Sequence, residues 1–295
     1  WMLAFGESPV AVRSLSLLFG VASIAAVYLL GYELYDRRTG LIAALLVSLS
    51  TFHIQYSQTA RMYAMLFFFG VLSLLFYIRC LRDHSLDNRF GYAISTLCML
   101  LTHPYGSLVL LGQLLHLAVR LGTAPNRNRI KRWLGTGTLT VVPFIPWLVV
   151  VAFQRYLVGG AETRWLSTAG FADIQNVAFA YVGVPVNYPT VNITSFAAVV
   201  GWFLIAAMSG VVGWQIYTEW RSDRDIRPAT LFGVVLLALV GLPFVISATV
   251  FPFFATRYTF LGLVPLFVLL AKSISDIDAP TVRYGVLAVV LVATL

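Results

Sequence analysis

Long apolar runs recur along nearly the whole chain, and they restrict its possible folds more than any other feature. Most of them approach the ~20 residues that an α-helix needs to cross a bilayer. Because 59% of the 295 residues are hydrophobic and only 11% are charged, the composition excludes an ordinary soluble domain. The sequence predicts an all-α, polytopic transmembrane helical bundle. Its expected apolar segments are Ser14–Leu34, Leu41–Ile54, Met62–Ile78, Gly91–Leu101, Leu108–Val119, Leu134–Phe153, Ile193–Tyr217, Ala229–Phe251, Thr259–Ala271 and Tyr284–Leu295.

The two ends of the chain suggest a fragment. The sequence opens at Trp1 without an initiator Met or a signal-like segment, and it stops at Leu295 inside an apolar run. We therefore expect an N- and C-terminally truncated protein that forms a single transmembrane domain over residues 1–295.

Fifteen of the 20 Lys and Arg residues fall in one set of loops between the apolar runs. Loops rich in positive charge stay on the cytoplasmic side of a membrane. Topology therefore explains the net charge of +8, and we expect no nucleic-acid partner. The basic residues of this face are Arg37, Arg38, Arg79, Arg82, Arg89, Arg120, Arg127, Arg129, Lys131, Arg132, Arg221, Arg224, Arg227, Lys272 and Arg283.

Polar residues also gather on the opposite, extracytoplasmic face. A connection at about 154–192 is long enough to form a partly ordered cap there. Three short runs, 41–54, 91–101 and 108–119, would let their outer ends stop below the membrane surface and leave a cavity. The residues of this face are Arg13, Arg61, Arg155, Arg164, Arg257, Glu7, Gln55, Gln58, Tyr63, His103, Glu162, Asp173 and Tyr258.

Two arginine–tyrosine pairs, Arg61-x-Tyr63 and Arg257-Tyr258, lie at the edges of apolar runs. An arginine inside the hydrocarbon edge costs about 2.5–3.5 kcal/mol on insertion scales, so it needs a partner. Phosphate is a natural partner because a guanidinium can hold its oxygens with two parallel hydrogen bonds. Each pair taken alone is also explained by an interfacial arginine that extends to water beside a tyrosine. Two pairs on one face favour an anion-binding site.

His103 lies between two short apolar runs in the stretch LTHPYGS, where Pro104 and Gly106 predict a tight turn. One interpretation is a histidine that is hydrogen-bonded within the turn. The other is a ligand or proton-relay residue beside the same cavity. Glu7 precedes a helix start that Ser8 and Pro9 indicate, so capping explains that stretch most simply.

Several kinds of site have no signal in the sequence. It contains no glycine-rich phosphate loop, no nucleophile elbow and no His-rich metal cluster. Cys80 and Cys98 fall within or beside apolar runs, so we expect packing residues and not a disulfide or zinc site. The tripeptide that begins at Asn192 fits an N-glycosylation acceptor on the outer face, although so short a match is weak evidence.

The stretch from about Phe5 to Arg82 contains RTGLIAALL and YSQTARMYAM, and weaker similarity continues in LTHPYGSLVLLGQ and FFATRYTFLGLVPLFVLLA. In these residues the chain resembles the dolichyl-phosphate-mannose–protein mannosyltransferase-like membrane glycosyltransferases of the GT-C superfamily. The resemblance implies a multi-pass protein of the cell membrane whose active site lies on the extracytoplasmic face. It would transfer a hexose or pentose from a polyprenyl-phosphate donor to a lipid, glycan or protein acceptor.

The resemblance also implies roles for the polar residues of the outer face. The donor phosphate is expected to dock on Arg61 and Arg257. Tyr63, Tyr258 and His103 are expected to line the same substrate-binding pocket.

Two features depart from the family pattern. Relatives use an acidic residue in the first outer loop as general base, and this chain begins after that loop, so we expect the base upstream of Trp1. Thr59 stands where relatives commonly carry Glu, which leaves the roles of Gln58 and Thr59 open. A divalent cation is compatible with the reaction, but the residues show no ligand set for one.

A transporter or flippase for a lipid-linked or anionic solute is the alternative, because it too places ionisable residues in a membrane cavity. Transporters tend to hold such residues near the midplane and to show paired repeats of interrupted helices. Here the polar residues gather at one face and no repeat is visible. A scaffold without chemistry would explain the hydrophobicity but not the outer arginines. An acidic pair in a first outer loop upstream of Trp1 would favour the enzyme.

Overall fold

The computed structural model describes residues 1–123, 127–158, 167–183, 196–221 and 226–294, and these residues form helices and connections without a strand. The all-α prediction is therefore confirmed. In chain order the helices are α1 (Met2–Phe5), α2 (Pro9–Leu34), α3 (Arg37–Leu49), α4 (Thr51–Ser57), α5 (Tyr63–Arg82), α6 (Leu86–Thr102), α7 (Gly106–Thr123), α8 (Arg127–Val158), α9 (Phe171–Tyr181), α10 (Phe196–Trp220), α11 (Pro228–Leu236), the π-helix η2 (Leu237–Gly241), α12 (Leu242–Thr249), the 3-10 helix η3 (Thr256–Gly262), α13 (Leu263–Ser275) and α14 (Pro280–Thr294).

Within the described part of the chain, four helical stretches are long and apolar enough to cross a membrane. They are Pro9–Leu34, Tyr63–Arg82, Pro228–Thr249 and Thr256–Ser275, and a fifth is added if two bent helices form one span. Together with a mean hydropathy of +0.85, these stretches identify a multi-pass membrane protein.

The apolar segment expected at Leu41–Ile54 is not one helix. α3 ends at Leu49, α4 begins at Thr51, and the two are bent by 65°. Ser50 separates them because its backbone is extended and its hydroxyl accepts a hydrogen bond from the amide of His53 at 3.4 Å, as an N-cap does. The expected apolar run thus contains two helices, and hydropathy gives no sign of the cap between them.

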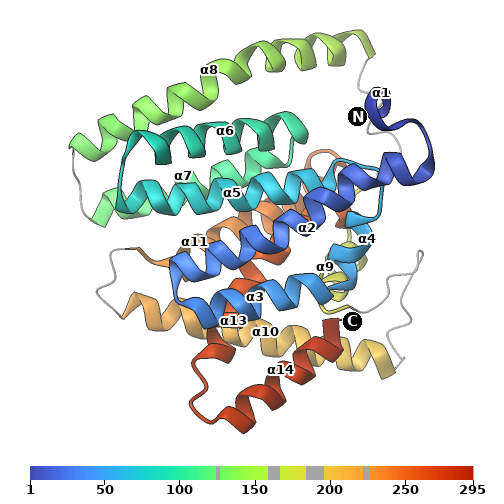
Figure 1. Ribbon diagram of the computed structural model, residues 1–295, viewed down its shortest axis with the longest axis vertical. Helices are drawn as coiled ribbons and strands as arrows, with labels where there is room; N and C mark the ends of the chain where they lie inside the picture. The colour runs from blue at the N-terminus through green and yellow to red at the C-terminus, as the bar shows by residue number, and fades with distance from the viewer. Residues whose placement is uncertain (124–126, 159–166, 184–195, 222–225, 295) are drawn as a thin grey trace.

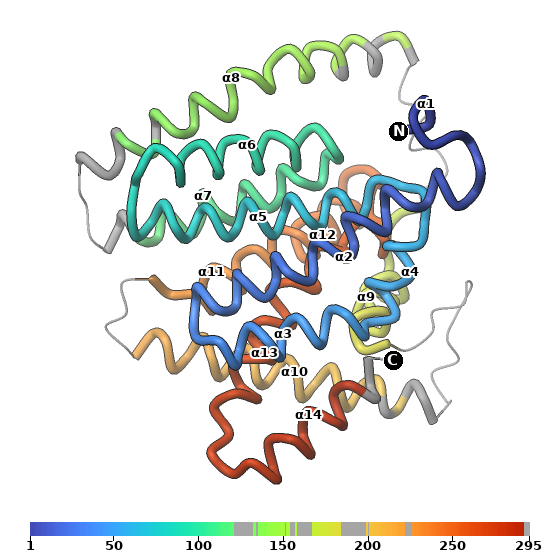
Figure 2. The backbone as a smooth tube through the Cα atoms, in the orientation of Figure 1, coloured from blue at the N-terminus to red at the C-terminus, as the bar shows by residue number. Residues whose placement is uncertain are grey.

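α13 lies at the centre of the bundle. Its span is 83% buried, more than any other candidate span, and the helix packs against α3, α10 and α11. α5 packs against α2 and α6, and α7 packs against α11. Figure 2 shows α8 along the outer edge of the molecule, where it packs against α6. The core therefore forms between the helices of the first and last thirds of the chain.

Two glycines of α2 bring it into direct contact with α3 and α4. A Cβ atom on Gly31 would lie 2.9 Å from the Cα atom of Gly40 in α3. Nearer the start of α2, a Cβ atom on Gly20 would collide with the side chain of Ser57 in α4. Real Cβ atoms do not come so close, so the packing of these three helices requires glycine at both positions of α2.

A buried chain of hydrogen bonds joins α5, α6 and α7. The amide of Gln113 donates to the hydroxyl of Ser73 at 3.0 Å and accepts from the hydroxyl of Tyr92 at 2.8 Å. The Tyr77 hydroxyl lies 2.8 Å from Nδ1 of His116. Because these groups satisfy one another in a dry interior, they hold the helices in register. Neutral polar residues inside apolar runs gave no sequence signal for this network.

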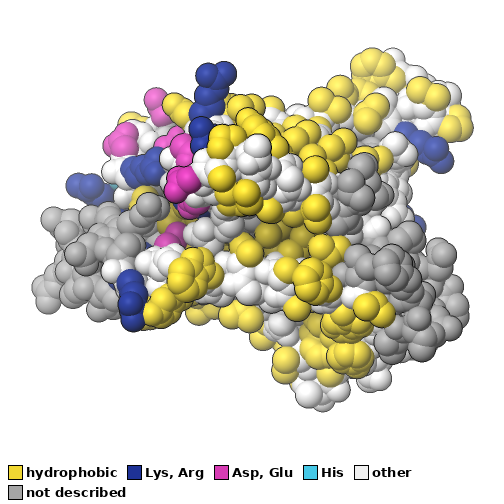
Figure 3. Space-filling view, turned by 90° about the horizontal axis from the view of Figure 1, so that it is seen from below, with side chains coloured by type: hydrophobic (Ala, Val, Ile, Leu, Met, Phe, Trp, Pro, Cys, Tyr) yellow, Lys and Arg dark blue, Asp and Glu magenta, His cyan; other side chains and the backbone are white. Residues whose placement is uncertain are grey.

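The helices place contrasting residues at opposite ends of the bundle (Figure 1). One end holds the α2–α3 and α5–α6 connections, and the other holds α4, α9 and the start of α5. Figure 3 shows Lys, Arg, Asp and Glu gathered mainly over one end of a face whose remainder is largely hydrophobic. We call the two ends the basic end, after Arg37, Arg38, Arg79, Arg82, Arg120, Arg132 and Lys272, and the tyrosine end, after Tyr56, Tyr63, Tyr105 and Tyr258. They correspond to the faces expected to be cytoplasmic and extracytoplasmic.

Carboxylates pair with several cations of the basic end. Glu33 accepts hydrogen bonds from Arg79 at 3.3 Å and from Arg82 at 2.6 Å. Lys272 pairs with Asp276 one turn later at 2.5 Å. These pairs join α2 to α5 and strengthen the end of α13. They are partly exposed, so each contributes about 0.2–1 kcal/mol.

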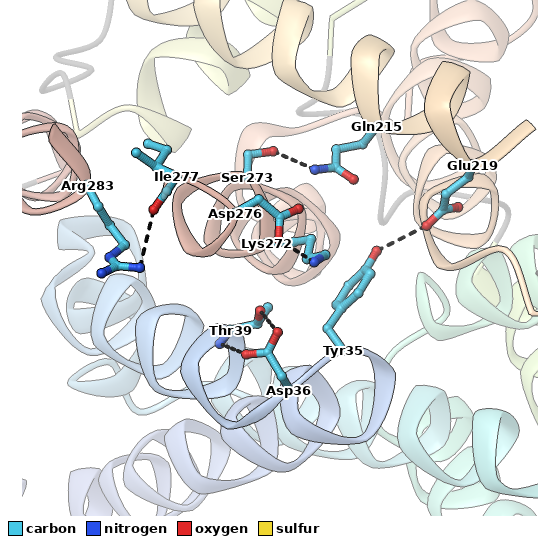
Figure 4. A network of polar contacts seen from close by, with 10 residues as sticks. All are labelled: Tyr35, Asp36, Thr39, Gln215, Glu219, Lys272, Ser273, Asp276, Ile277 and Arg283. Carbon is cyan, nitrogen blue, oxygen red and sulfur yellow. Dashed lines mark hydrogen bonds and ion pairs between the residues drawn. The ribbon is translucent and has the colours of Figure 1, made fainter. Parts of the chain in front are cut away.

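A second group of polar contacts at the basic end joins α10 to α11 and α13 (Figure 4). The Tyr35 hydroxyl donates to the carboxylate of Glu219 at 3.3 Å, as Figure 4 shows. The amide of Ala229 donates to the other carboxylate oxygen at 2.7 Å. Gln215 donates to the hydroxyl of Ser273 at 2.9 Å. The buried Glu219 therefore supports the start of α11 by accepting one of its otherwise unsatisfied amides.

The connection expected at about 154–192 is partly helical. α8 continues to Val158, and α9 lies farther along, where it packs against η3 and α10. Asp173 caps α9 by accepting a hydrogen bond from the amide of Gly170 at 2.9 Å. The predictions made for Glu162, Arg164 and Asn192 concern positions outside the described residues.

Candidate functional site

Arg61 lies in a short connection between α4 and α5. The Thr59 hydroxyl donates to the carbonyl of Gln55 at 2.7 Å, and the Arg61 amide donates to the carbonyl of Thr59 at 2.7 Å. Ser16 of α2 donates to the carbonyl of Arg61 at 3.2 Å. The connection is thus tied to two helices, and the exposed Arg61 side chain stands directly before the buried Tyr63 at the start of α5.

Arg257 and Tyr258 lie in η3, directly before α13. The chain enters η3 through a turn in which the amides of Phe253 and Phe254 both donate to the hydroxyl of Ser247, at 3.1 and 3.2 Å. The guanidinium of Arg257 lies over the ring of Tyr258, 5.3 Å from its centroid. Such a cation–π contact orients the guanidinium.

His103 occupies the predicted turn between α6 and α7. Its Nδ1 atom accepts a hydrogen bond from the amide of Tyr105 at 3.1 Å. A Cβ atom on Gly106 would lie 2.9 Å from the carbonyl oxygen of Met99, so the turn needs glycine there. The sequence interpretation of a histidine hydrogen-bonded within the turn is therefore confirmed.

The structure brings the predicted site residues together from three separate elements. The ring of His103 lies 5.0 Å from that of Tyr258 and 6.0 Å from that of Tyr63, and the two tyrosine rings are 6.4 Å apart. Arg61 stands two residues before Tyr63, and the guanidinium of Arg257 lies over the ring of Tyr258. Two cations distant in sequence therefore border the same cluster of rings at the tyrosine end.

Two tyrosines of this cluster were not predicted. Tyr105 lies 5.0 Å from Tyr258 by ring centroids, and its hydroxyl lies 3.5 Å from the carbonyl of Phe253. Tyr56 packs edge-on against Tyr63 at 4.9 Å. Tyr105 belongs to LTHPYGS and Tyr56 to QYSQTARMYAM, the stretches that contain His103 and Tyr63. Their closeness in sequence to these two residues was the only sign that they could join the cluster.

His103 is neutral at physiological pH. Burial, with a smaller contribution from the positive charge of Arg257, lowers the pKa of His103 from 6.5 to about 4. Since Nδ1 accepts the hydrogen bond from Tyr105, the proton of the neutral ring is on Nε2. His103 can therefore donate a hydrogen bond to an anion while it adds no charge to the site.

The remaining polar residues expected on this face lie at the surface. Glu7, Arg13, Gln55 and Gln58 are all exposed, and Glu7 forms no ion pair with Arg13 in the described structure. Ser8 caps α2 by accepting a hydrogen bond from the amide of Ala11 at 3.2 Å, as the sequence predicts.

Metal ligands do not come together in the part of the chain that the structure describes. No group of three or more His, Cys, Asp or Glu side chains has the proximity that a metal ion needs. Cys80 and Cys98 are both free thiols.

A large apolar cavity adjoins the site. It has a volume of ≈ 510 Å³ and lies between α9, α10, η2 and α13. Tyr181 separates it from η3, because this side chain lines the cavity and its hydroxyl donates to the carbonyl of Thr259 at 2.6 Å. A second apolar cavity of ≈ 430 Å³ lies between α6, α7 and α8. Two of the short predicted runs, 91–101 and 108–119, lie in α6 and α7. Neither cavity is lined by Arg61 or Arg257.

A family model described as dolichyl-phosphate-mannose-protein mannosyltransferase matches residues 1–150. The match therefore covers half of the chain and includes Arg61, Tyr63 and His103. No curated protein matches the sequence.

Solved structures of membrane enzymes share the fold. ArnT from Cupriavidus metallidurans bound to undecaprenyl phosphate is 14% identical with a TM-score of 0.64 over 98% of this chain and 50% of that chain. Its apo form is 12% identical with a TM-score of 0.57 over 98% and 49%. An Archaeoglobus fulgidus oligosaccharyltransferase tethered to an acceptor peptide is 14% identical with a TM-score of 0.52 over 100% and 44%. At such identities the similarity is one of fold, and this chain spans about half the length of these proteins.

Proposed function

The chain belongs to the dolichyl-phosphate-mannose-protein mannosyltransferase family, and on this premise we propose that it is a membrane glycosyltransferase with a polyprenyl-phosphate sugar as donor. The acceptor is a lipid, a glycan or a protein on the extracytoplasmic side of the membrane. The observation that carries the proposal is that Arg61 and Arg257, far apart in sequence, both border the cluster of Tyr63, Tyr258 and His103.

The tyrosine end offers suitable groups for a phosphate. Each guanidinium can give two parallel hydrogen bonds to phosphate oxygens. Nε2 of His103 and the hydroxyl of Tyr63 supply further donors within the same cluster. Arg61 and Arg257 give the site two positive charges, and the neutral His103 adds none. A phosphate with one or two negative charges therefore matches the site.

The lipid part of the donor needs an apolar surface close to this phosphate site. The cavity of ≈ 510 Å³ meets that need, because its lining is largely aliphatic and only the side chain of Tyr181, which donates to the Thr259 carbonyl, lies between it and η3 there. Among the proteins of the same fold, ArnT was solved with undecaprenyl phosphate. We assign the cavity to the first isoprene units of the donor.

In the proposed reaction the acceptor oxygen attacks the anomeric carbon of the sugar. The bond from this carbon to the phosphate oxygen breaks, its electron pair stays on the phosphate, and the acceptor proton passes to a general base. The configuration at the anomeric carbon is inverted. Because negative charge grows on the phosphate as the bond breaks, Arg61 and Arg257 stabilise the transition state more than the bound substrate.

The test replaces Arg61 and Arg257 separately with Ala in the full-length protein. We expect each change to lower the rate of sugar transfer by about 10²-fold, as the loss of one donor to a developing oxyanion does. Transfer is measured with purified polyprenyl-phosphate sugars and the membrane fraction as the source of acceptor.

Arg221→Ala is the matched control. Arg221 also lies over a tyrosine ring, at 4.7 Å from the centroid of Tyr217, but at the basic end of the bundle. This variant should transfer sugar at the wild-type rate. Wild-type activity in both Arg61→Ala and Arg257→Ala would remove the phosphate site, and lipid movement without transfer would favour a flippase.

A further inference from the structure

A second group of arginines surrounds a cavity at the basic end, on the opposite side of the molecule from the proposed donor site. The cavity has a volume of ≈ 160 Å³, well above the ~10–15 Å³ that one water molecule needs. It lies between the last turn of α5, the α5–α6 connection, the end of α7 and the start of α8. Its polar lining residues are Cys80, Arg82, His84, Arg120, Arg132 and Trp133.

Positively charged side chains dominate the described lining of this cavity. Three arginines from three different helices line it. Arg82 shares the carboxylate of Glu33 with Arg79, so one negative charge serves two cations there. Arg120 is 8% exposed, which places its charge inside the bundle wall and not on the surface.

Hydrogen bonds hold the walls of the cavity in place. Thr136 of α8 accepts a hydrogen bond from Nε of Arg89 at 3.1 Å, and its hydroxyl lies 3.2 Å from Nε2 of His84. The other ring nitrogen of His84 lies 3.2 Å from the carbonyl of Cys80, and Trp133 packs edge-on against His84 at 5.4 Å. The α5–α6 connection is thus fixed to α8, so the positive charges do not depend on a loose loop for their positions.

We propose that this cavity binds a phosphate-bearing anion, either the headgroup of an anionic phospholipid in the adjacent leaflet or free phosphate. Basic pockets between transmembrane helices on the cytoplasmic side are suited to such headgroups. Guanidinium groups from α5, α7 and α8 can contact different oxygens of one phosphate at the same time. The bound anion would join α8 to α5 and α7 at the end of the bundle, and it plays no part in the transfer reaction.

The experiment measures the thermal unfolding of the full chain in vesicles. Three conditions are compared: phosphatidylcholine alone, phosphatidylcholine with phosphatidylglycerol, and phosphatidylcholine with inorganic phosphate in the buffer. We expect the unfolding temperature to rise with phosphatidylglycerol if the ligand is a headgroup, and with inorganic phosphate if the ligand is the free anion. A rise in neither condition contradicts the proposal.

Three variants locate the effect. Arg132→Gln removes an exposed lining charge with little risk to folding, and it should weaken the binding of the effective ligand about tenfold. Arg120→Lys keeps the buried charge but loses the planar fork, and it should weaken binding in the same direction. Arg38→Gln is the control, because Arg38 is exposed at the same end but does not line the cavity. Equal weakening by Arg38→Gln would show a general attraction to surface charge and overturn the assignment.

Discussion

Arginine is found at both ends of the bundle, but its surroundings differ. At the basic end, Glu33 accepts hydrogen bonds from Arg79 and Arg82, and Lys272 pairs with Asp276. At the tyrosine end, Arg257 lies over a tyrosine ring, and aromatic side chains form most of the cluster around it. Cations at the basic end also lie over aromatic rings, as Arg79 does over Phe76 and Arg221 over Tyr217, so the ion pairs are what distinguish that end. The comparison therefore contrasts arginines that join helices through a carboxylate with the arginines that we propose as the phosphate site.

The largest expected effect is on the stability of the fold when His103, at the tyrosine end, gains a proton. The pKa of His103 falls from 6.5 in an unfolded chain to about 4, because of burial and of Arg257. Below pH 6.5 the unfolded chain therefore binds a proton that the folded chain rejects, so the contribution to stability is complete above pH 6.5 and is lost as the pH falls towards 4. The full difference corresponds to on the order of 3 kcal/mol.

Thermal unfolding of wild type and His103→Gln in detergent between pH 4 and 7 tests this expectation. The Gln variant keeps a polar side chain but cannot titrate, so its unfolding temperature should change less steeply over this interval. Parallel curves for the two proteins would show that His103 accepts a proton as readily in the fold as outside it, and that the tyrosine end tolerates positive charge.

A smaller effect is expected when Arg257 is replaced by Lys. The charge remains, but the planar group that packs on Tyr258 and gives two parallel hydrogen bonds is lost. Sugar transfer should fall by about tenfold, which corresponds to ~1.4 kcal/mol. Arg82→Lys at the basic end, where only charge matters for the pair with Glu33, should leave transfer unchanged. If both variants transfer sugar equally well, the planar shape of the Arg257 guanidinium does not matter for transfer.

The smallest effect is expected at Glu33. Glu33→Gln leaves Arg79 and Arg82 without their shared carboxylate, and it should lower the free energy of unfolding by about 1 kcal/mol because both pairs are partly exposed. Thermal unfolding in detergent at low and high salt measures this, and the wild-type advantage should shrink at high salt. Sugar transfer should stay at the wild-type rate. A loss of transfer without a loss of stability would place the basic end in the reaction.

Apolar runs predicted most of the helices because a membrane demands them, and the start of α2 followed from Ser8 and Pro9. The break at Ser50 was missed, since a single serine inside an apolar run has several possible conformations and only tertiary packing selects the cap. The π-helix at Leu237–Gly241 was missed for a similar reason, as no residue type there demands the wider turn. Local sequence thus predicts where helices form better than where they bend.

For the candidate site, the sequence predicted residue types and their common face but not the contacts. Arg61 and Arg257 attracted attention because charge is costly beside hydrocarbon. The packing of Tyr105 between His103 and Tyr258 depends on how α6, α7 and η3 meet, which no local pattern contains. The same holds for the network around Gln113, whose members are ordinary polar residues in three separate runs.

The close contact between Gly20 and Ser57 means that the position of Arg61 depends on an uncharged residue of α2. A methyl group at Gly20 would push α4, the helix that precedes Arg61, away from α2. It would shift one guanidinium relative to the other while every ionisable group kept its identity. A substitution at Gly20 therefore tests the distance between Arg61 and Arg257 while both charges are kept. Replacing an arginine changes the charge as well.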